Sequence, residues 1–116
     1  MQVTWHKCPG DVWCNLLTLN LRHEQFRGLE GVYIVWHGGP KPAVVYVGQG
    51  AIAQRLETHR ENPAILAFSR LGLFVTWAWV RTDARDGVER HLANRLRPLV
   101  GVAHPITAAI EVNLPW

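Results

Sequence analysis

The sequence has no long hydrophobic run, few cysteines and no recognisable leader segment. None of its apolar stretches reaches about 18 residues, the length that a membrane-spanning helix needs, so no such helix is predicted. The N-terminal segment MQVTWHKCPGD has no apolar core before a small-residue cleavage site, which argues against a secretory signal. We therefore expect a cytoplasmic protein without a membrane partner, in which the two cysteines, Cys8 and Cys14, are thiols.

Internal repeats, low-complexity tracts and linkers are also absent, so residues 1–116 are expected to form a single domain. The composition, 48% hydrophobic and 18% charged, is globular and excludes a disordered chain. A chain of this length buries about two thirds of its unfolded surface, so it needs no disulfide to fold. The net charge of +3 is compatible with a polyanionic partner such as nucleic acid, but many basic proteins bind none.

Two neighbouring runs predict a β-hairpin. The segments GVYIVW (31–36) and AVVYV (43–47) are rich in β-branched and aromatic residues, and HGGPKP between them breaks strands. The two-residue period of a strand places Val32 and Tyr33 on opposite faces. Gly48 is expected to end the second strand.

A helix, a buried strand and a second helix are predicted next. Residues 51–61 have helical spacing, and Pro63 suits the end of this helix. Residues 73–80, LFVTWAWV, are apolar on both faces of a strand, which indicates a strand covered on both sides. Residues 84–97 predict the last helix, with Thr82 or Asp83 as its N-cap.

The two ends of the chain are less regular. Residues 11–26 contain leucines behind Asp11, a candidate N-cap, so part of this segment is expected to be helical. The tail, residues 106–116, is expected to add a short strand or to lie along the body. The order helix, hairpin, helix, strand, helix indicates an α+β fold in which helices cover a small antiparallel or mixed sheet.

Four polar side chains in these elements have complementary chemistry. Tyr33 and Tyr46 supply phenols from the hairpin, and Arg55 supplies a permanent cation from the helix that follows. Glu89 supplies a carboxylate beside the apolar stripe of the last helix. Phosphodiester hydrolysis needs a group that deprotonates water, a charge that stabilises the phosphate and a divalent metal that helps the leaving oxygen. The four groups match these needs.

The same residues carry a resemblance to a known family. GVY, then YVG, then an arginine in RLETH and a glutamate in VERHLANRLRP occur in this order, and the sequence resembles the GIY-YIG nuclease superfamily over residues 31–98. Either triplet alone is common by chance, whereas all four elements in order form a specific signal. The resemblance implies a sheet of three antiparallel strands flanked by helices, and an endonuclease that acts on DNA.

The resemblance also implies a role for each of the four residues. Tyr33 would be the general base or would orient the attacking water, and Tyr46 would lie beside it, close to the scissile phosphate. Arg55 would stabilise the charge on the phosphate. Glu89 would be the sole protein ligand of one Mg²⁺ or Mn²⁺, whose other ligands would be waters and phosphate oxygens.

Gly48 and His59 would complete the site. Gly48 would allow a tight backbone turn beneath it, and His59, one helical turn after Arg55, would hold a tyrosine or the phosphate. A free tyrosine has a pKa of about 10 and is a poor base at neutral pH. The arginine and the metal are expected to lower the pKa of Tyr33; otherwise His59 would take the proton, because its reference pKa is near neutral.

One position departs from the family pattern. Members often have an asparagine soon after the last helix, as proline, two residues, asparagine, but here the pattern is PLVG and Gly101 takes that place. Asn94 and Asn113 are the candidate substitutes. The departure bears on support of the phosphate more than on the metal site.

Each candidate residue also has an ordinary structural explanation. Tyr33 and Tyr46 could be strand aromatics, and Arg55 could form an exposed ion pair with a nearby glutamate. His59 could be a packed or surface histidine, and Glu89 could be favoured by the helix dipole. A chance explanation must produce all of them in family order, so the nuclease interpretation is preferred.

Other residues offer further interpretations. The cysteines and nearby histidines form a candidate zinc set, His6, Cys8, Cys14 and His23. Their spacing does not match paired zinc ligands, so thiols and surface histidines are expected instead. Most tryptophans, including Trp77 and Trp79, are expected in the core, whereas Trp36, beside the hairpin loop, could stack on a base. The basic side chains that could contact substrate phosphates are Lys41, Arg60, Arg85, Arg90 and Arg97.

The sequence therefore predicts a small metal-dependent nuclease that hydrolyses DNA phosphodiester bonds and, as the resemblance implies, leaves 5′-phosphate and 3′-hydroxyl ends. No second DNA-binding module is evident, so the enzyme could be structure-directed or single-strand-directed. The first alternative is a nucleic-acid-binding module that has the same fold and does not cleave. The second is a protein-interaction domain. The choice between DNA and RNA and the oligomeric state remain open.

Overall fold

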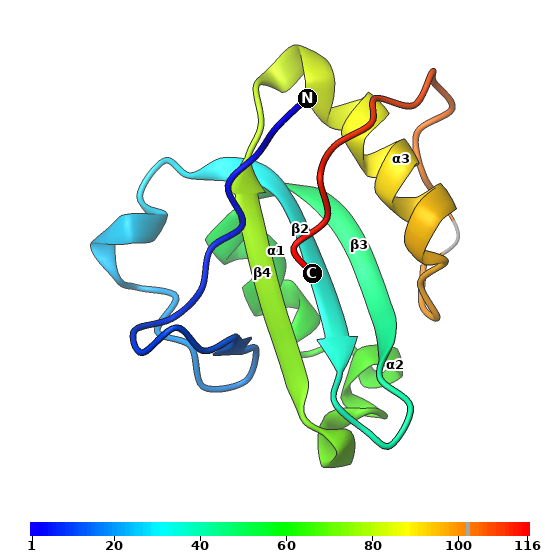
Figure 1. Ribbon diagram of the computed structural model, residues 1–116. Helices are drawn as coiled ribbons and strands as arrows, with labels where there is room; N and C mark the ends of the chain where they lie inside the picture. Colours follow the sequence, from blue (N-terminus) through cyan, green and yellow to red (C-terminus); the bar gives the residue numbers. More distant parts are fainter. Residues whose placement is uncertain (102) are drawn as a thin grey trace.

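The computed structural model describes residues 1–101 and 103–116, and its central feature is a four-stranded antiparallel sheet. The strands are β1 (Cys14–Asn15), β2 (Glu30–His37), β3 (Ala43–Ala51) and β4 (Leu73–Trp79), in the spatial order β1-β4-β2-β3 (Figure 1). β2 pairs with both β3 and β4, so the strand that carries Tyr33 lies inside the sheet. The α+β class is confirmed, but the sheet has four strands rather than three.

The predicted hairpin is confirmed, although its second strand is longer than expected. β3 continues beyond Gly48, so the expectation that Gly48 ends the strand was wrong. Tyr33 pairs with Gly48, and Val35 pairs with Tyr46. The register shifts between Val35 and Trp36, which places a bulge in β3 beside Tyr46. Bulges re-aim side chains, and this one lies next to a candidate site residue.

The predicted strand at residues 73–80 is confirmed as β4, but it is not covered along its whole length. Trp77 is 1% exposed and belongs to the core, as expected. Trp79 is 63% exposed, so its expected place in the core was wrong. Gly31 explains how closely β4 approaches β2, because a Cβ at this position would lie 2.0 Å from the carbonyl oxygen of Ala78.

The α-helices of the described chain are α1 (Ile52–His59), α2 (Pro63–Leu66) and α3 (Arg85–Leu96). Pro63 lies just past the end of α1, as expected, and also begins α2, because a proline suits the first helical position and Asn62 caps the helix by accepting from Ala64 N. The predicted N-cap at Thr82 or Asp83 was wrong, since both belong to a short 3-10 turn before α3. No described helix is long and apolar enough to cross a membrane.

The sheet has one hydrophobic core on each face. On the first face Tyr33 and Val35 pack with Ile52 and Leu56 of α1. On the second face the packed residues include Val32, Ile34, Val88 and Leu92, the last two from α3. The predicted alternation of Val32 and Tyr33 is thus confirmed. Figure 1 shows α1 and α2 behind the sheet and α3 beside β3.

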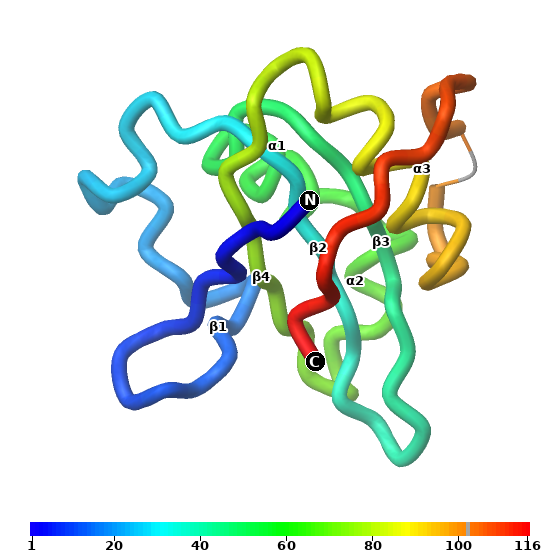
Figure 2. The backbone as a smooth tube through the Cα atoms, turned by 45° about the horizontal axis from the view of Figure 1, so that its top comes forward, coloured from blue at the N-terminus to red at the C-terminus, as the bar shows by residue number. Residues whose placement is uncertain are grey.

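The two terminal segments cover part of the second face and lie side by side (Figures 1 and 2). Val3 N donates to Asn113 Oδ1 at 2.7 Å, and Asn113 Nδ2 donates to Val3 O at 3.0 Å. Trp5 Nε1 donates to the Asn113 carbonyl at 2.8 Å. The tail therefore lies along the body, which was one of the two expected arrangements. Asn113 holds the two termini together.

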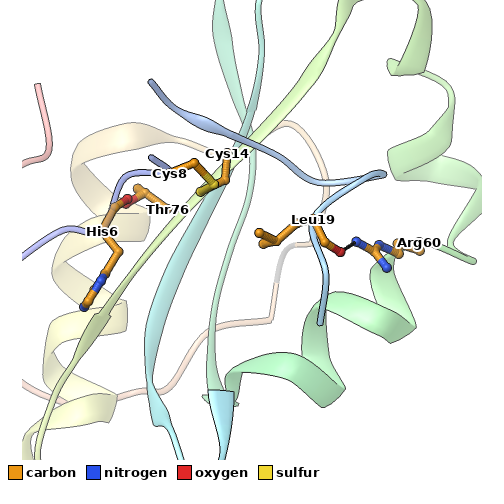
Figure 3. Close-up of a disulfide and its surroundings, with 6 residues drawn as sticks. All are labelled: His6, Cys8, Cys14, Leu19, Arg60 and Thr76. Carbon is orange, nitrogen blue, oxygen red and sulfur yellow. Dashed lines mark hydrogen bonds between the residues drawn. A yellow bond between two sulfur atoms is a disulfide. The ribbon is translucent and has the colours of Figure 1, made fainter. Parts of the chain in front are cut away.

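The region 11–26 differs most from expectation. It contains β1 and a 3-10 turn, Glu24–Phe26, instead of an α-helix, and Asp11 has a left-handed φ of 58° rather than a capping conformation. Arg60 holds the segment against the end of α1, because its guanidinium donates to the carbonyl oxygens of Leu16 and Leu19. Figure 3 shows the contact with Leu19. The leucines of this segment thus pack through tertiary contacts, not along a helix.

The expectation of two thiols was wrong, because Cys8 and Cys14 form a disulfide (Figure 3). The chain turns back between them, and their Cα atoms lie 5.2 Å apart, within the range that a disulfide requires. The bonded sulfurs cannot serve as zinc thiolates, which agrees with the rejection of the candidate zinc set. Disulfides persist mainly in oxidising compartments, so this bond does not support the expected cytoplasmic location.

Candidate active site

Tyr33 and Tyr46 lie next to each other on the face of the sheet that α1 covers. Their rings are nearly parallel, with an interplanar angle of 11° and a centroid distance of 6.1 Å. Gly48 makes room for them, because a Cβ there would lie 2.4 Å from the Tyr33 hydroxyl oxygen and 3.0 Å from Tyr46 Cε1. The two phenols therefore require glycine at position 48 for contact, whereas the sequence analysis expected a tight turn.

The two tyrosines differ in exposure. Tyr33 is 0% exposed, whereas Tyr46 is partly exposed. Solvent therefore reaches Tyr46 and not Tyr33. This difference reverses the expected order of the two phenols, since Tyr33 was the one expected to contact the attacking water.

His59, at the end of α1, contacts both phenols. The Tyr33 hydroxyl lies 2.5 Å from His59 Nε2, and the Tyr46 ring centroid lies 4.3 Å from that of His59. Burial and the nearby charge of Arg55 lower the pKa of His59 to about 4. The imidazole is therefore neutral at pH 7, and its Nε2 shares a hydrogen bond with the Tyr33 hydroxyl.

Arg55 joins this group from the preceding turn of α1. Its side chain is partly exposed, and a hydrogen bond to Tyr33 raises the pKa of Arg55, with a smaller contribution from Tyr46. The described residues provide it with no ion pair, so the ordinary explanation of a pairing with a nearby glutamate is not what the structure contains. A cation without a carboxylate partner remains available to an anionic ligand.

Arg55 acts to lower the pKa of Tyr33, as expected, and the further lowering expected from a metal stays a prediction. Burial raises the pKa of Tyr33 above its ordinary value and outweighs the opposing effect of Arg55. His59 is also a weak base in this environment, because its pKa is lowered to about 4. At neutral pH the Tyr33 hydroxyl thus keeps its proton and the His59 ring stays neutral, which favours a positioning role for this buried pair.

Glu89 comes from α3, which packs against the edge strand β3. It is 7% exposed, and its charge makes a small contribution to the raised pKa of Tyr33, although α3 covers the second face of the sheet. His104 Nδ1 donates to Glu89 Oε2 at 2.9 Å. His104 was not identified from the sequence, because a histidine in an irregular tail carries no periodic signal.

The donor set around Glu89 fits a hydrated Mg²⁺ or Mn²⁺ and does not fit a metal held mainly by protein. Within residues 1–101 and 103–116 no group of three histidine, cysteine, aspartate or glutamate side chains could hold a metal ion. Mg²⁺ usually keeps several waters and takes only one or two carboxylates, so one oriented glutamate is sufficient. The hydrogen bond from His104 provides that orientation.

The other predicted residues contribute unequally. Lys41 is exposed in the loop between β2 and β3, whereas Arg60 is occupied by backbone carbonyls and Arg85 pairs with Glu30 at 2.8 Å. Gly101, at the position of the family asparagine, packs on Tyr46, since a Cβ there would lie 2.8 Å from the ring. That position therefore has no room for a phosphate-supporting side chain.

A comparison of the chain with models of known protein families, with curated proteins and with solved structures finds no match.

Proposed function

We propose that the protein is a metal-dependent nuclease that hydrolyses phosphodiester bonds, with DNA as the expected substrate. The observation that carries the proposal is the convergence of two phenols, a guanidinium and an imidazole from residues separated by up to 26 positions in sequence. These are the residue types that the sequence pattern singled out, and they form one continuous group on one side of β3. The resemblance to GIY-YIG nucleases supports the reaction type.

The partly exposed groups meet the substrate in this proposal. Arg55 binds the scissile phosphate and stabilises its increasing negative charge, because it has no competing carboxylate. Tyr46 orients the attacking water. A divalent metal bound by Glu89 would supply Lewis-acid assistance to the leaving oxygen.

The buried groups support the exposed ones. Tyr33 hydrogen-bonds His59, and its interaction with the neighbouring Arg55, which raises the pKa of Arg55, favours a fixed guanidinium beside the two phenols. His104 holds the carboxylate of Glu89 by donating to Oε2. Both are positioning residues, and their contribution is to reduce the reorganisation that the site needs during the reaction.

The experiment is a cleavage assay on single-stranded, duplex and branched DNA with Mg²⁺ or Mn²⁺. Arg55→Ala, Glu89→Ala and Tyr46→Phe are expected to lose at least about a hundredfold in cleavage rate. The matched controls are Glu57→Ala, an exposed glutamate on α1, and Arg70→Ala, an exposed arginine outside the site. Controls that lose as much activity as the site variants would contradict the assignment.

A second candidate is a nucleic-acid-binding module that does not cleave, and the glycine at position 101 favours it because the family asparagine is missing. In that case the wild type and Glu89→Ala bind DNA equally, and neither cuts any form of DNA in either metal. A protein-interaction domain is the third. It predicts that salt-sensitive DNA binding is absent as well.

A further inference from the structure

An aromatic pocket lies at the loop end of the β2–β3 hairpin, outside the tyrosine site. It has a volume of about 670 Å³, within the range of cavities that bind small organic groups. Three tryptophans that are distant in sequence, Trp13, Trp36 and Trp116, line it together with Arg95 and Arg97 near the end of α3. We refer to these five residues as the tryptophan pocket.

The indole rings of the tryptophan pocket contact one another and remain open to solvent. Trp36 and Trp116 have a centroid distance of 5.0 Å, and Trp13 lies 5.3 Å from Trp36. Trp116 is 61% exposed, and the other two are partly exposed. Large exposed aromatic surface is costly in water, so a flat apolar group that covers these rings would bind favourably.

The charge of the tryptophan pocket indicates which kind of aromatic ligand it would bind. Arg95 and Arg97 are exposed, and neither has an ion pair among the described residues. No acidic side chain is among the described residues that line the pocket. A planar group attached to an anion complements both features, and a nucleobase beside a phosphate has this composition.

The chain that leaves the pocket leads to the candidate active site. After Arg97, the backbone runs along the edge strand, with Leu99 N donating to Val44 O and Val100 N donating to Val45 O. The backbone then reaches Gly101, which lies against the ring of Tyr46. The tryptophan pocket and Tyr46 therefore lie along the same edge of the sheet, on opposite faces.

We propose that the tryptophan pocket binds an unpaired base of a single-stranded segment of the substrate, with Arg95 or Arg97 on a flanking phosphate. The inference rests on the proposed function, because it names the form of nucleic acid that the nuclease acts on. Bases in a duplex are paired and stacked, so the indole rings reach a base only where the strand is single. The proposal therefore predicts that the protein prefers single-stranded nucleic acid.

The test is binding of a fluorescently labelled oligothymidine to the full chain in EDTA, so that cleavage does not interfere. Trp116→Ala is expected to weaken binding at least about fivefold. Arg95→Ala is expected to reduce the slope of log affinity against log salt by about 0.7. Trp79→Ala is the matched control, since Trp79 is 63% exposed and lies outside the pocket, and Arg70→Ala is the control for charge.

Each outcome supports or overturns the proposal. Selective loss in Trp116→Ala and Arg95→Ala supports it, and wild-type affinity in Trp116→Ala overturns it. Free thymidine monophosphate that binds as tightly as the oligonucleotide would indicate a site for free nucleotides. A change in sedimentation of the free protein on Trp116→Ala, without a change in affinity, would indicate a contact between two copies.

The cleavage assay keeps this proposal separate from the proposed function. A wild type that cuts DNA while Trp116→Ala binds normally refutes the pocket and leaves the nuclease. A wild type that binds single strands through the pocket but cuts nothing in either metal refutes hydrolysis and leaves the pocket.

Discussion

Replacement of Gly48 by alanine is expected to disrupt the paired phenols. The new Cβ would lie 2.4 Å from the Tyr33 hydroxyl oxygen and 2.6 Å from its Cζ, whereas heavy atoms in contact lie about 3.5–4.0 Å apart. The ring would have to move by about 1 Å. It has no free space for this movement, because Tyr33 is 0% exposed and its hydroxyl is bonded to His59.

The structure indicates the size of the effect. Overpacking of a buried site costs about 1–3 kcal/mol. Separation of Tyr33 from His59 leaves buried polar groups unpaired, which costs about 1–3 kcal/mol more. A total of about 2–6 kcal/mol corresponds to a decrease in Tm of roughly 8–24 °C for a domain of this length. Cleavage should fall as well, since the guanidinium that Tyr33 supports would move.

A double-mutant cycle with Tyr33→Phe isolates the contact. Removal of the hydroxyl oxygen eliminates the closest clash and leaves the one with Cζ, so the relief is partial. In urea unfolding, Gly48→Ala should cost at least about 1 kcal/mol less in the Tyr33→Phe background than in the wild type. Gln49→Ala, at the next position of β3, is the control. An equal cost in both backgrounds, or an unchanged Tm for Gly48→Ala, would refute the reasoning.

Three further results are expected. Burial lowers the pKa of His59 to about 4, below its unfolded value of about 6.5. Between these pH values the unfolded chain binds a proton that the folded chain does not. The free energy of unfolding should therefore fall by up to about 3 kcal/mol as the pH decreases from 7 to 4. Urea unfolding should show a smaller pH dependence for His59→Gln, and an identical one would contradict this account. Gly101→Asn, which introduces the asparagine typical of GIY-YIG nucleases, should lower stability by about 1–3 kcal/mol because of its contact with Tyr46, and a higher Tm would contradict it. Replacement of Cys8 and Cys14 by serine should cost about 2 kcal/mol by the chain-entropy model, whereas full alkylation of the unreduced protein would show that the disulfide is absent.

Local sequence patterns were sufficient to predict the elements that are specified by their own residues. The β-branched runs around a Gly/Pro break predicted the hairpin of β2 and β3, and the helical spacing after it predicted α1. The alternation of Val32 and Tyr33 between two cores follows from the two-residue period alone. The helix expected within residues 11–26 was wrong, because leucines that pack against other segments have a spacing similar to that of an irregular helix.

The candidate site was predicted in composition but not in arrangement. The sequence singled out Tyr33, Tyr46, Arg55 and His59, which the fold brings together on one face of the sheet. It did not reveal which phenol solvent reaches. It also did not reveal the partner of Glu89, because that partner comes from a tail with no periodic pattern.

The sequence by itself determined the order of the main strands and helices and the set of polar residues that face one another across them, because spacing along a chain decides which side chains share a face. Only the tertiary structure decided the disulfide, the burial of Tyr33, the protonation of His59 and the tryptophan pocket. The burial of Tyr33, the protonation of His59 and the tryptophan pocket depend on distances between segments far apart in the chain, and the disulfide depends on how the loop between its two cysteines turns back. Such distances are set by packing of the whole domain, which no local pattern encodes.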